Sequence, residues 1–334
     1  EILDSQRVPI TGSDRTSGDY PYYGANGIQD YVDDFIFDDE LVLLAEDGGN
    51  FGSKTRPIAY RVSGKCWVNN HAHVLKPKAG LDVDYLCYSL MFYDVGGMVN
   101  GATRQKLTQA AMRQMIIPKR SLDEQIEIVN IIKKVQGVIA SRKEELEQLD
   151  LLIKARFVEM FGDPIYNANN LPMMCLNDLG VWNSGGTPSR TNPAYFTGEI
   201  DWYSAGELNT LYLEGSIEKI TEEAIQESAA KLFKAGSMLV GMYDTAAFKM
   251  GILKKASASN QACACIEPNE TVNIVWLYYS LQLMKEHFLS QRRGVRQKNL
   301  NLGMIKGFEI PIADRGKQDE FVCFAEQVDK SKVV

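Results

Sequence analysis

The chain has 334 residues, of which 45% are hydrophobic and 24% are charged, and its formal net charge is −7. This composition excludes a disordered or fibrous chain and is typical of a globular protein long enough for two domains. No apolar run approaches the roughly 20 residues that cross a bilayer. The six cysteines form neither a disulfide framework nor a zinc-ribbon spacing. We therefore expect a cytoplasmic protein.

The acidic balance argues against a nucleic-acid partner, because DNA-binding proteins often carry an excess of Lys and Arg. The basic residues are unevenly distributed, however. Residues 102–120 contain five basic side chains and no acidic one, and residues 289–300 contain four and none. Two local basic segments therefore remain candidates for contacts with phosphates.

In the first half of the chain, residues 41–47 have the pattern of a buried strand. A second strand is expected at residues 69–74 and a helix around residues 85–90. The first basic segment follows, and Ile117-Pro118 closes the region. We expect these elements to form one α/β domain, over residues 1–120.

Residues 122–161 contain no proline and one glycine, and they predict a single long helix of roughly 58 Å. Ser121, with Glu124 three residues later, is a plausible N-cap, and Gly162 and Pro164 end the helix. Apolar residues recur four and three apart, which is a coiled-coil register. These seam residues are Ile128, Ile132, Val135, Ile139, Leu146, Leu149, Ile153 and Met160. Such a seam needs a partner helix.

The second half repeats the first in the same order, which predicts two similar domains. In the alignment, residues 41–47 match 238–244, 69–74 match 259–264, 85–90 match 276–281, 104–107 match 296–300, and 123–125 match 316–318. We expect the second domain at residues 163–313 and, at residues 314–334, the incomplete start of a second long helix, the natural partner for the seam. The predicted fold class is α+β.

This layout resembles the specificity subunit of type I restriction-modification systems. The segments that carry the resemblance are residues 7–10, 20–28 and 123–125 in the first copy, and residues 184–190, 195–202 and 260–261 in the second. Gly316-Lys317-Gln318 departs from it, because the family usually has an acidic residue before the glutamine. The resemblance implies two target-recognition domains, each reading one half of a split DNA site, with two helices running antiparallel between them as a spacer.

The resemblance also implies a subunit without catalytic activity and without a cofactor. Its expected partners are double-stranded DNA, two copies of an adenine methyltransferase subunit and, through that complex, restriction subunits. Two other functions stay open: a coiled-coil adaptor that binds only protein, and the recognition part of a DNA methyltransferase or nuclease.

Candidate DNA contacts are polar and basic residues in glycine- or proline-marked loops, where binding residues concentrate. Arg pairs well with guanine, Gln with adenine and Lys with phosphate. The candidates are Arg7, Tyr22, Tyr23, Asn26, Arg104, Gln105 and Lys106 in the first copy, and Thr187, Ser189, Arg190, Tyr203, Arg292, Arg293, Arg296, Gln297 and Lys298 in the second.

Two motifs suggest enzymatic or metal chemistry but are better explained structurally. His71 and His73 align near Cys263 and Cys265, so both pairs are expected at buried positions on strands, without the further ligands that zinc needs. Residues 192–195 are similar to the catalytic tetrapeptide of adenine methyltransferases but lack its second proline. We therefore predict no metal site and no catalytic residues.

Overall fold

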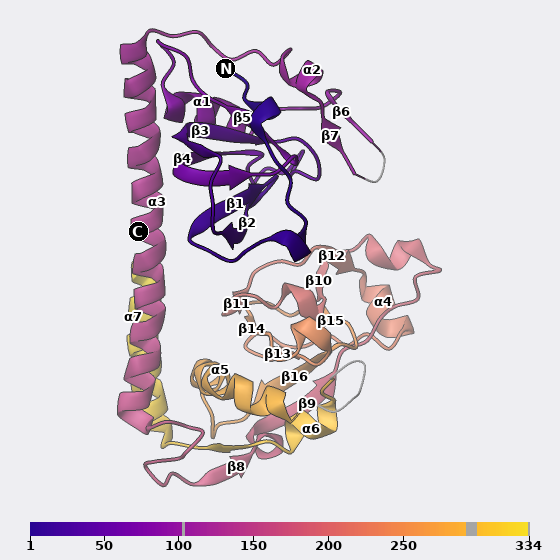
Figure 1. The fold of residues 1–334 in the computed structure, drawn as a ribbon. Coiled ribbons are helices and arrows are strands. Elements are labelled where there is room, and N and C mark those ends of the chain that lie inside the picture. Colours follow the sequence, from indigo (N-terminus) through magenta and orange to yellow (C-terminus); the bar gives the residue numbers. More distant parts are fainter. Residues whose placement is uncertain (102–103, 292–298, 333–334) are drawn as a thin grey trace. The chain divides into compact units, whose positions relative to one another are not determined.

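The computed structural model describes residues 1–101, 104–291 and 299–332. The chain forms two compact units, Glu1–Arg142 and Lys143–Val334. The division falls inside the longest helix, α3 (Leu122–Phe161), which contributes residues to both units (Figure 1). The predicted assignment of recognition domains to residues 1–120 and 163–313 stays a prediction. Within the described ranges, none of the helices has both the length and the apolar composition needed to span a bilayer.

Unit 1 is built on a five-stranded sheet with the strand order β2-β1-β4-β3-β5. Its elements are η1 (Asp4–Gln6), η2 (Gly12–Asp14), β1 (Tyr20–Gly24), β2 (Gly27–Val32), β3 (Phe37–Ala45), β4 (Ala59–Val68), β5 (Ala72–Leu75), α1 (Val83–Met91), β6 (Val99–Asn100), β7 (Lys106–Leu107) and α2 (Gln109–Met112). Strands β1 and β4 are parallel, and the other pairs are antiparallel.

The predicted buried strand is β3, which lies between β4 and β5. Because successive side chains point to opposite faces of a strand, its apolar residues enter two separate cores. Val42 and Leu44 pack in the core that includes helix α1, and Leu41 and Leu43 pack in the core on the other face. All four are fully buried, which explains the continuous apolar run.

Unit 2 contains a five-stranded sheet in the order β11-β14-β13-β16-β9 and a three-stranded sheet in the order β12-β10-β15. Its strands are β8 (Met173–Cys175), β9 (Gly180–Ser184), β10 (Ile200–Tyr203), β11 (Tyr212–Leu213), β12 (Glu218–Ile220), β13 (Met238–Gly241), β14 (Met250–Leu253), β15 (Ala258–Ser259), β16 (Cys263–Pro268) and β17 (Glu309–Pro311). Its helices are η3 (Leu176–Leu179), η4 (Pro193–Phe196), η5 (Ala205–Glu207), α4 (Glu222–Glu227), η6 (Asp244–Ala246), α5 (Ile274–Ser290), α6 (Leu302–Lys306) and α7 (Arg315–Ser331).

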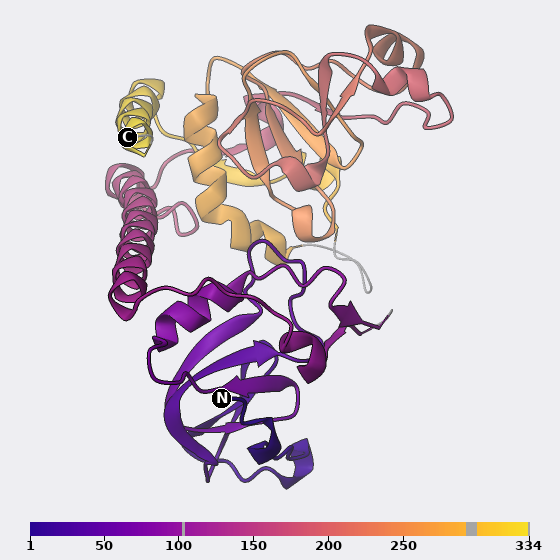
Figure 2. The ribbon, with the colours of Figure 1, turned by 90° about the horizontal axis from the view of Figure 1, so that it is seen from above.

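Helix α7 packs along the C-terminal part of α3, as Figures 1 and 2 show. Phe157 of α3 lies 5.2 Å from Phe321 of α7 and 5.6 Å from Trp276 of α5, measured between ring centroids. At the C-cap of α7, Lys332 pairs with Asp150 of α3 at 2.6 Å. Because residue numbers fall along α3 as they rise along α7, the two helices are antiparallel. Four of the predicted seam residues, Leu146, Leu149, Ile153 and Met160, lie in this half, and Ile153 among them is fully buried.

Helix α3 has the bounds that the sequence predicts, because its ends are set by local chemistry. Ser121 and Glu124 form a reciprocal capping box: the backbone N–H of Ser121 donates to Glu124 at 2.8 Å, and the backbone N–H of Glu124 donates to the Ser121 hydroxyl at 3.3 Å. Gly162, with φ of +78°, follows the last turn. In the middle of the helix, Val135 and Ile139 are about half exposed, at 52% and 51%.

The two units repeat individual hydrogen bonds, and these show which residue of unit 1 corresponds to which residue of unit 2. The backbone N–H of Asn69 donates to the carbonyl of Tyr23 at 3.0 Å, and that of Asn260 donates to Tyr203 at 2.9 Å. Each asparagine side chain then accepts from the backbone two residues later. The duplication predicted from the sequence is therefore present in the structure.

These contacts correct the predicted alignment by one residue at the strands. Asn69 corresponds to Asn260, so His73 corresponds to Ala264 rather than to Cys263. The prediction was wrong here because few identical residues span the repeat, and only the ladder of hydrogen bonds determines the register. The histidine pair and the cysteine pair are not equivalent.

Candidate nucleic-acid interface

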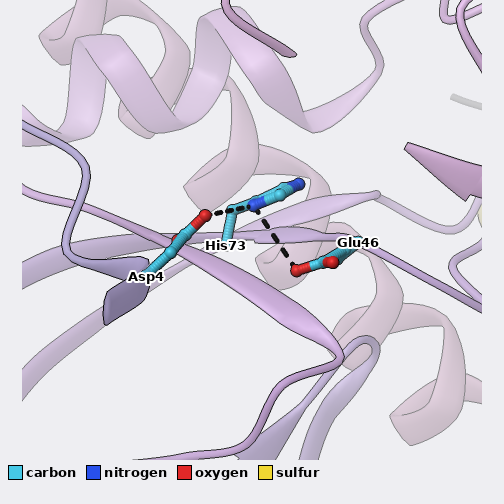
Figure 3. Close-up of side chains that lie close together, drawn as sticks. All are labelled: Asp4, Glu46 and His73. Atoms are coloured by element: carbon cyan, nitrogen blue, oxygen red, sulfur yellow. Dashed lines mark hydrogen bonds and ion pairs between the residues drawn. The ribbon is translucent and has the colours of Figure 1, made fainter. Parts of the chain in front are cut away.

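Three titratable side chains meet at the end of β3 in unit 1: Asp4, Glu46 and His73 (Figure 3). The His73 Nδ1 atom lies 2.7 Å from Asp4 and 3.6 Å from Glu46, and Nε2 lies 2.9 Å from the carbonyl oxygen of Leu107. Both ring nitrogens therefore face oxygen acceptors.

Cations already surround the two carboxylates of this cluster. The Arg7 guanidinium donates to Glu46 at 2.5 Å, and Lys106 lies 3.0 Å from Glu46. Burial alone would raise the pKa of Asp4, but hydrogen bonds from His73, Gln109 and the backbone of Val74 lower it to about 2. Hydrogen bonds from Arg7 and Lys106 likewise overcome burial and lower the pKa of Glu46. The cluster is an ion-pair network that joins strand ends, with its ligand atoms engaged by protein groups.

This network supports the loop that carries the predicted DNA contacts Arg104, Gln105 and Lys106. Lys106 pairs with Glu46, and Arg104 pairs with Asp47 at 2.5 Å. The backbone N–H of Gly48 donates to the carbonyl of Gln105 at 3.1 Å. The Arg104 and Lys106 side chains remain 60% and 49% exposed. Two cations are thus held at the surface by carboxylates that follow a buried strand.

Asn26 contacts the same loop after β3 as Gln105 does. Its side-chain amide donates to the carbonyl of Gly48 at 2.9 Å, so the β1–β2 turn, the loop after β3 and the β6–β7 hairpin meet there. The structure therefore brings together four of the predicted site residues: Asn26, Arg104, Gln105 and Lys106.

A cleft of about 550 Å³ adjoins this surface and was not predicted. Its lining includes Phe51 and Lys54 from the loop after β3, Phe92 and Tyr93 after α1, and Gln105. The loop carries three glycines, and Arg56 follows Lys54. Glycine-rich loops with basic residues directly after a buried strand are candidates for phosphate contacts, so a signal was present in the sequence.

Arg7 and Tyr22 lie in positions that do not suit DNA contacts. The Arg7 side chain is 12% exposed and is engaged by Glu46 and the carbonyl of Ala72. Tyr22 is 1% exposed, and its hydroxyl accepts from the backbone N–H of Ile10 at 3.0 Å. Tyr23 is half-buried, and burial raises the pKa of its hydroxyl. Packing of the sheet, which local sequence does not reveal, accounts for all three.

In unit 2, Arg190 is held flat at the surface. Its guanidinium donates two hydrogen bonds to Glu218, at 2.5 and 2.7 Å, and lies 4.2 Å from the centroid of the Phe196 ring. Unit 1 has a similar arrangement, at residues that are not among the predicted DNA contacts. Arg15 pairs with Asp30 at 3.2 Å and lies 4.2 Å from the Tyr22 ring.

The other predicted residues of unit 2 differ in exposure. Thr187 donates to the side chain of Gln261, and Ser189 contacts the hydroxyl of Thr191 at 2.7 Å near the surface. Tyr203 is 1% exposed and belongs to a buried cluster, so it is a core residue. The remaining predictions, Arg292, Arg293, Arg296, Gln297 and Lys298, lie outside the described residues.

The chain matches the family model described as the type I restriction modification DNA specificity domain, over residues 1–151 and 170–333. A type I restriction enzyme specificity subunit of Haemophilus influenzae is 34% identical over 183 residues, which are 54% of this chain and 47% of that protein. A specificity subunit of a type I restriction enzyme of Escherichia coli is 23% identical over 220 residues, covering 64% of this chain and 53% of its own length. The chain thus spans about half the length of these relatives.

Solved structures share the fold. The S subunit of a type I restriction-modification system from M. genitalium aligns with 99% of this chain and 89% of its own, with a TM-score of 0.57 and 13% identity. A second structure, from work on complex assembly and conformational transition of the type I system, aligns with 100% of this chain and 90% of its own, with a TM-score of 0.58 and 14% identity.

These findings confirm the predicted family and the α+β fold with a long helix between two domains. The family model describes a DNA specificity domain, which agrees with the predicted recognition of DNA. The two matched segments include residues of both repeats and leave a gap within unit 2. The chain belongs to the type I restriction modification DNA specificity domain family.

Proposed function

We propose that this chain is the subunit that selects the DNA site of a cytoplasmic type I restriction-modification complex. Each repeated unit reads one half of a split site, and the antiparallel helices α3 and α7 set the number of base pairs between the halves. The chain also holds two adenine methyltransferase subunits and, through them, restriction subunits. It contributes recognition and no cofactor chemistry.

The observation that carries this proposal is the duplication of individual contacts in the two units. Leu107 and Leu300 are both buried, and their backbone N–H groups donate to the residues that follow equivalent strands, Glu46 at 2.7 Å and Met242 at 2.8 Å. The predicted basic segments precede these two leucines. A repeated scaffold with different loop sequences suits two different half-sites on one DNA molecule.

In unit 1 the proposed DNA surface consists of Asn26, Lys54, Arg104, Gln105 and Lys106. Arg104 and Lys106 are 60% and 49% exposed although they pair with carboxylates, so both cations face solvent where a phosphate can bind. Gln105 can bind adenine through its amide. In unit 2, Thr187, Ser189 and Arg190 are the described candidates.

Methylome sequencing tests the proposal. Cells expressing the full-length chain with its cognate methyltransferase subunit are compared with cells expressing the methyltransferase alone. We expect methylated adenines in one new split motif that depends on the chain. A confirmed complex that produces no such motif would contradict the proposal and favour the protein-binding adaptor.

A further inference from the structure

One buried glutamine near the start of helix α3 joins three parts of unit 1. The Gln125 side chain is 2% exposed. Its Oε1 atom accepts from the backbone N–H of Asp82 at 2.8 Å, and its Nε2 atom donates to the carbonyls of Gly80 at 2.9 Å and Arg120 at 3.0 Å. Asp82 is the N-cap of α1. The amide thus ties the start of α3 to the start of α1.

Unit 2 contains the same arrangement around Gln318, which is fully buried near the start of α7. Its Oε1 atom accepts from the backbone N–H of Asn273, the N-cap of α5, at 2.8 Å. Its Nε2 atom donates to the carbonyls of Thr271 at 3.1 Å and Ala313 at 2.8 Å. Three contacts of one glutamine are therefore repeated by the other.

Only an uncharged amide fits these surroundings. The site offers one N–H donor and two carbonyl acceptors, and among side chains of this length the glutamine amide supplies one acceptor and two donors. A glutamate would place a carboxylate against two carbonyls, and methionine would leave three partly buried backbone groups without their side-chain partner. Polar groups that lose a hydrogen bond inside a protein lower its stability.

A second repeated contact lies eleven residues, or about 16 Å, further along each helix. The hydroxyl of Tyr88 on α1 donates to Gln136 on α3 at 2.9 Å, and the hydroxyl of Tyr279 on α5 donates to Asp329 on α7 at 3.3 Å. Two contacts that lie apart fix both the position and the direction of α3 against α1, and of α7 against α5. Each long helix is therefore attached to its own unit at two points.

We propose that Gln125 and Gln318 are positioning residues that determine which spacer length the protein accepts. This inference rests on the proposed function. One additional base pair moves a half-site by about 3.4 Å and turns it by about 34°. Where each long helix is held firmly against its own unit, the unit cannot follow the displaced half-site, and DNA with that spacer is not accepted. Where the attachment at the glutamine is lost, the unit can tilt on its helix and follow the displaced half-site.

The test is the methylome of cells that carry the full chain and its methyltransferase subunit. The variants are Gln125→Met, Gln318→Met and the more conservative Gln125→Glu, with Tyr88→Phe as a change that removes only the second contact. Gln148→Met on α3 and Gln327→Met on α7 are matched controls, because both glutamines are exposed. Circular dichroism checks that each purified variant is folded.

We expect the half-site sequences to stay the same while methylation at spacers one base pair shorter or longer rises about tenfold relative to the native spacer, as the loss of hydrogen bonds worth one decade in binding predicts. The controls keep one spacer. Tyr88→Phe, which leaves the core intact, shows the same change in weaker form.

The inference is overturned if folded Gln125 and Gln318 variants, or Tyr88→Phe where these do not fold, methylate only the native spacer. Loss of all methylation by a folded variant also overturns it. Failure of the proposed function looks different, because the unmodified chain then produces no split motif at all.

Discussion

Asp4 is a carboxylate whose ionisation is coupled to the folding of unit 1. Its folded pKa is about 2, against an ordinary value of 3.8. A lowered pKa means that the ionised group stabilises the fold above pH 3.8, and that this contribution disappears as the pH falls towards 2. The difference corresponds to about 2 kcal/mol.

We therefore expect Asp4→Asn to lower the free energy of unfolding by at least about 2 kcal/mol at pH 6, and by much less at pH 2. Urea unfolding of the two proteins at several pH values measures this difference. Asp19→Asn, at an exposed position, is the control. A difference between Asp4→Asn and the parent protein that does not change with pH would refute the coupling.

Arg104 and Arg7 are both predicted to contact DNA, but the structure places their side chains in different surroundings. Arg104 is 60% exposed, whereas Arg7 is 12% exposed within an ion-pair network. Removal of one member of a buried ion pair leaves an uncompensated charge. Arg7→Ala should therefore unfold the protein more readily, by about 3 kcal/mol.

Arg104→Gln should leave stability almost unchanged and weaken DNA binding by about 1–3 kcal/mol, as the loss of one base or phosphate contact predicts. Fluorescence anisotropy with a labelled duplex that contains the methylated motif measures the affinity. Arg61→Gln is the matched control, because Arg61 is an exposed arginine of the same unit that also pairs with carboxylates and lies outside the two basic segments. Equal losses in the two variants would count against a specific role for Arg104.

At the scale of the element, the seam of α3 is covered to different degrees along its length. Ile153 is fully buried against the core of unit 2, and Ile139 is 51% exposed. Ile153→Ala should lower the free energy of unfolding by about 2–5 kcal/mol, because it removes apolar burial and leaves a cavity.

Ile139→Ala should cost well under half as much, since its side chain is already half in water. Chemical denaturation of the two variants beside the parent chain gives both values. If the two substitutions cost the same, a further segment covers the middle of the helix in solution.

At the scale of the whole molecule, the proposed spacer depends on the length of the helical rod. An insertion of one heptad between Gly137 and Val138 keeps the seam in register and adds about 10 Å. At about 3.4 Å per base pair, the accepted spacer should grow by about three base pairs. Methylome sequencing of the insertion variant gives the spacer length and the half-site sequences in one experiment. A changed half-site sequence would show that the rod and the recognition surfaces are not independent.

The sequence by itself determined the features of this protein that depend on neighbouring residues. Helix α3 was predicted with its observed bounds, because the capping box at Ser121 and the stop at Gly162 act within a few residues. The duplication was also visible, since it appears as the order of matching segments. The family entered as a resemblance carried by segments of both repeats, and the family model confirms it.

Only the tertiary structure decided which side chains are available. Arg7, Tyr22 and Tyr203 belong to sequence patterns typical of binding loops, yet they are buried by strands that are distant in the sequence. The predicted alignment of the two repeats was off by one residue at the strands, because long-range hydrogen bonds determine the strand register. The two buried glutamines were visible in the sequence as a repeated Gln, but their role depends on carbonyls and N–H groups up to 47 residues away.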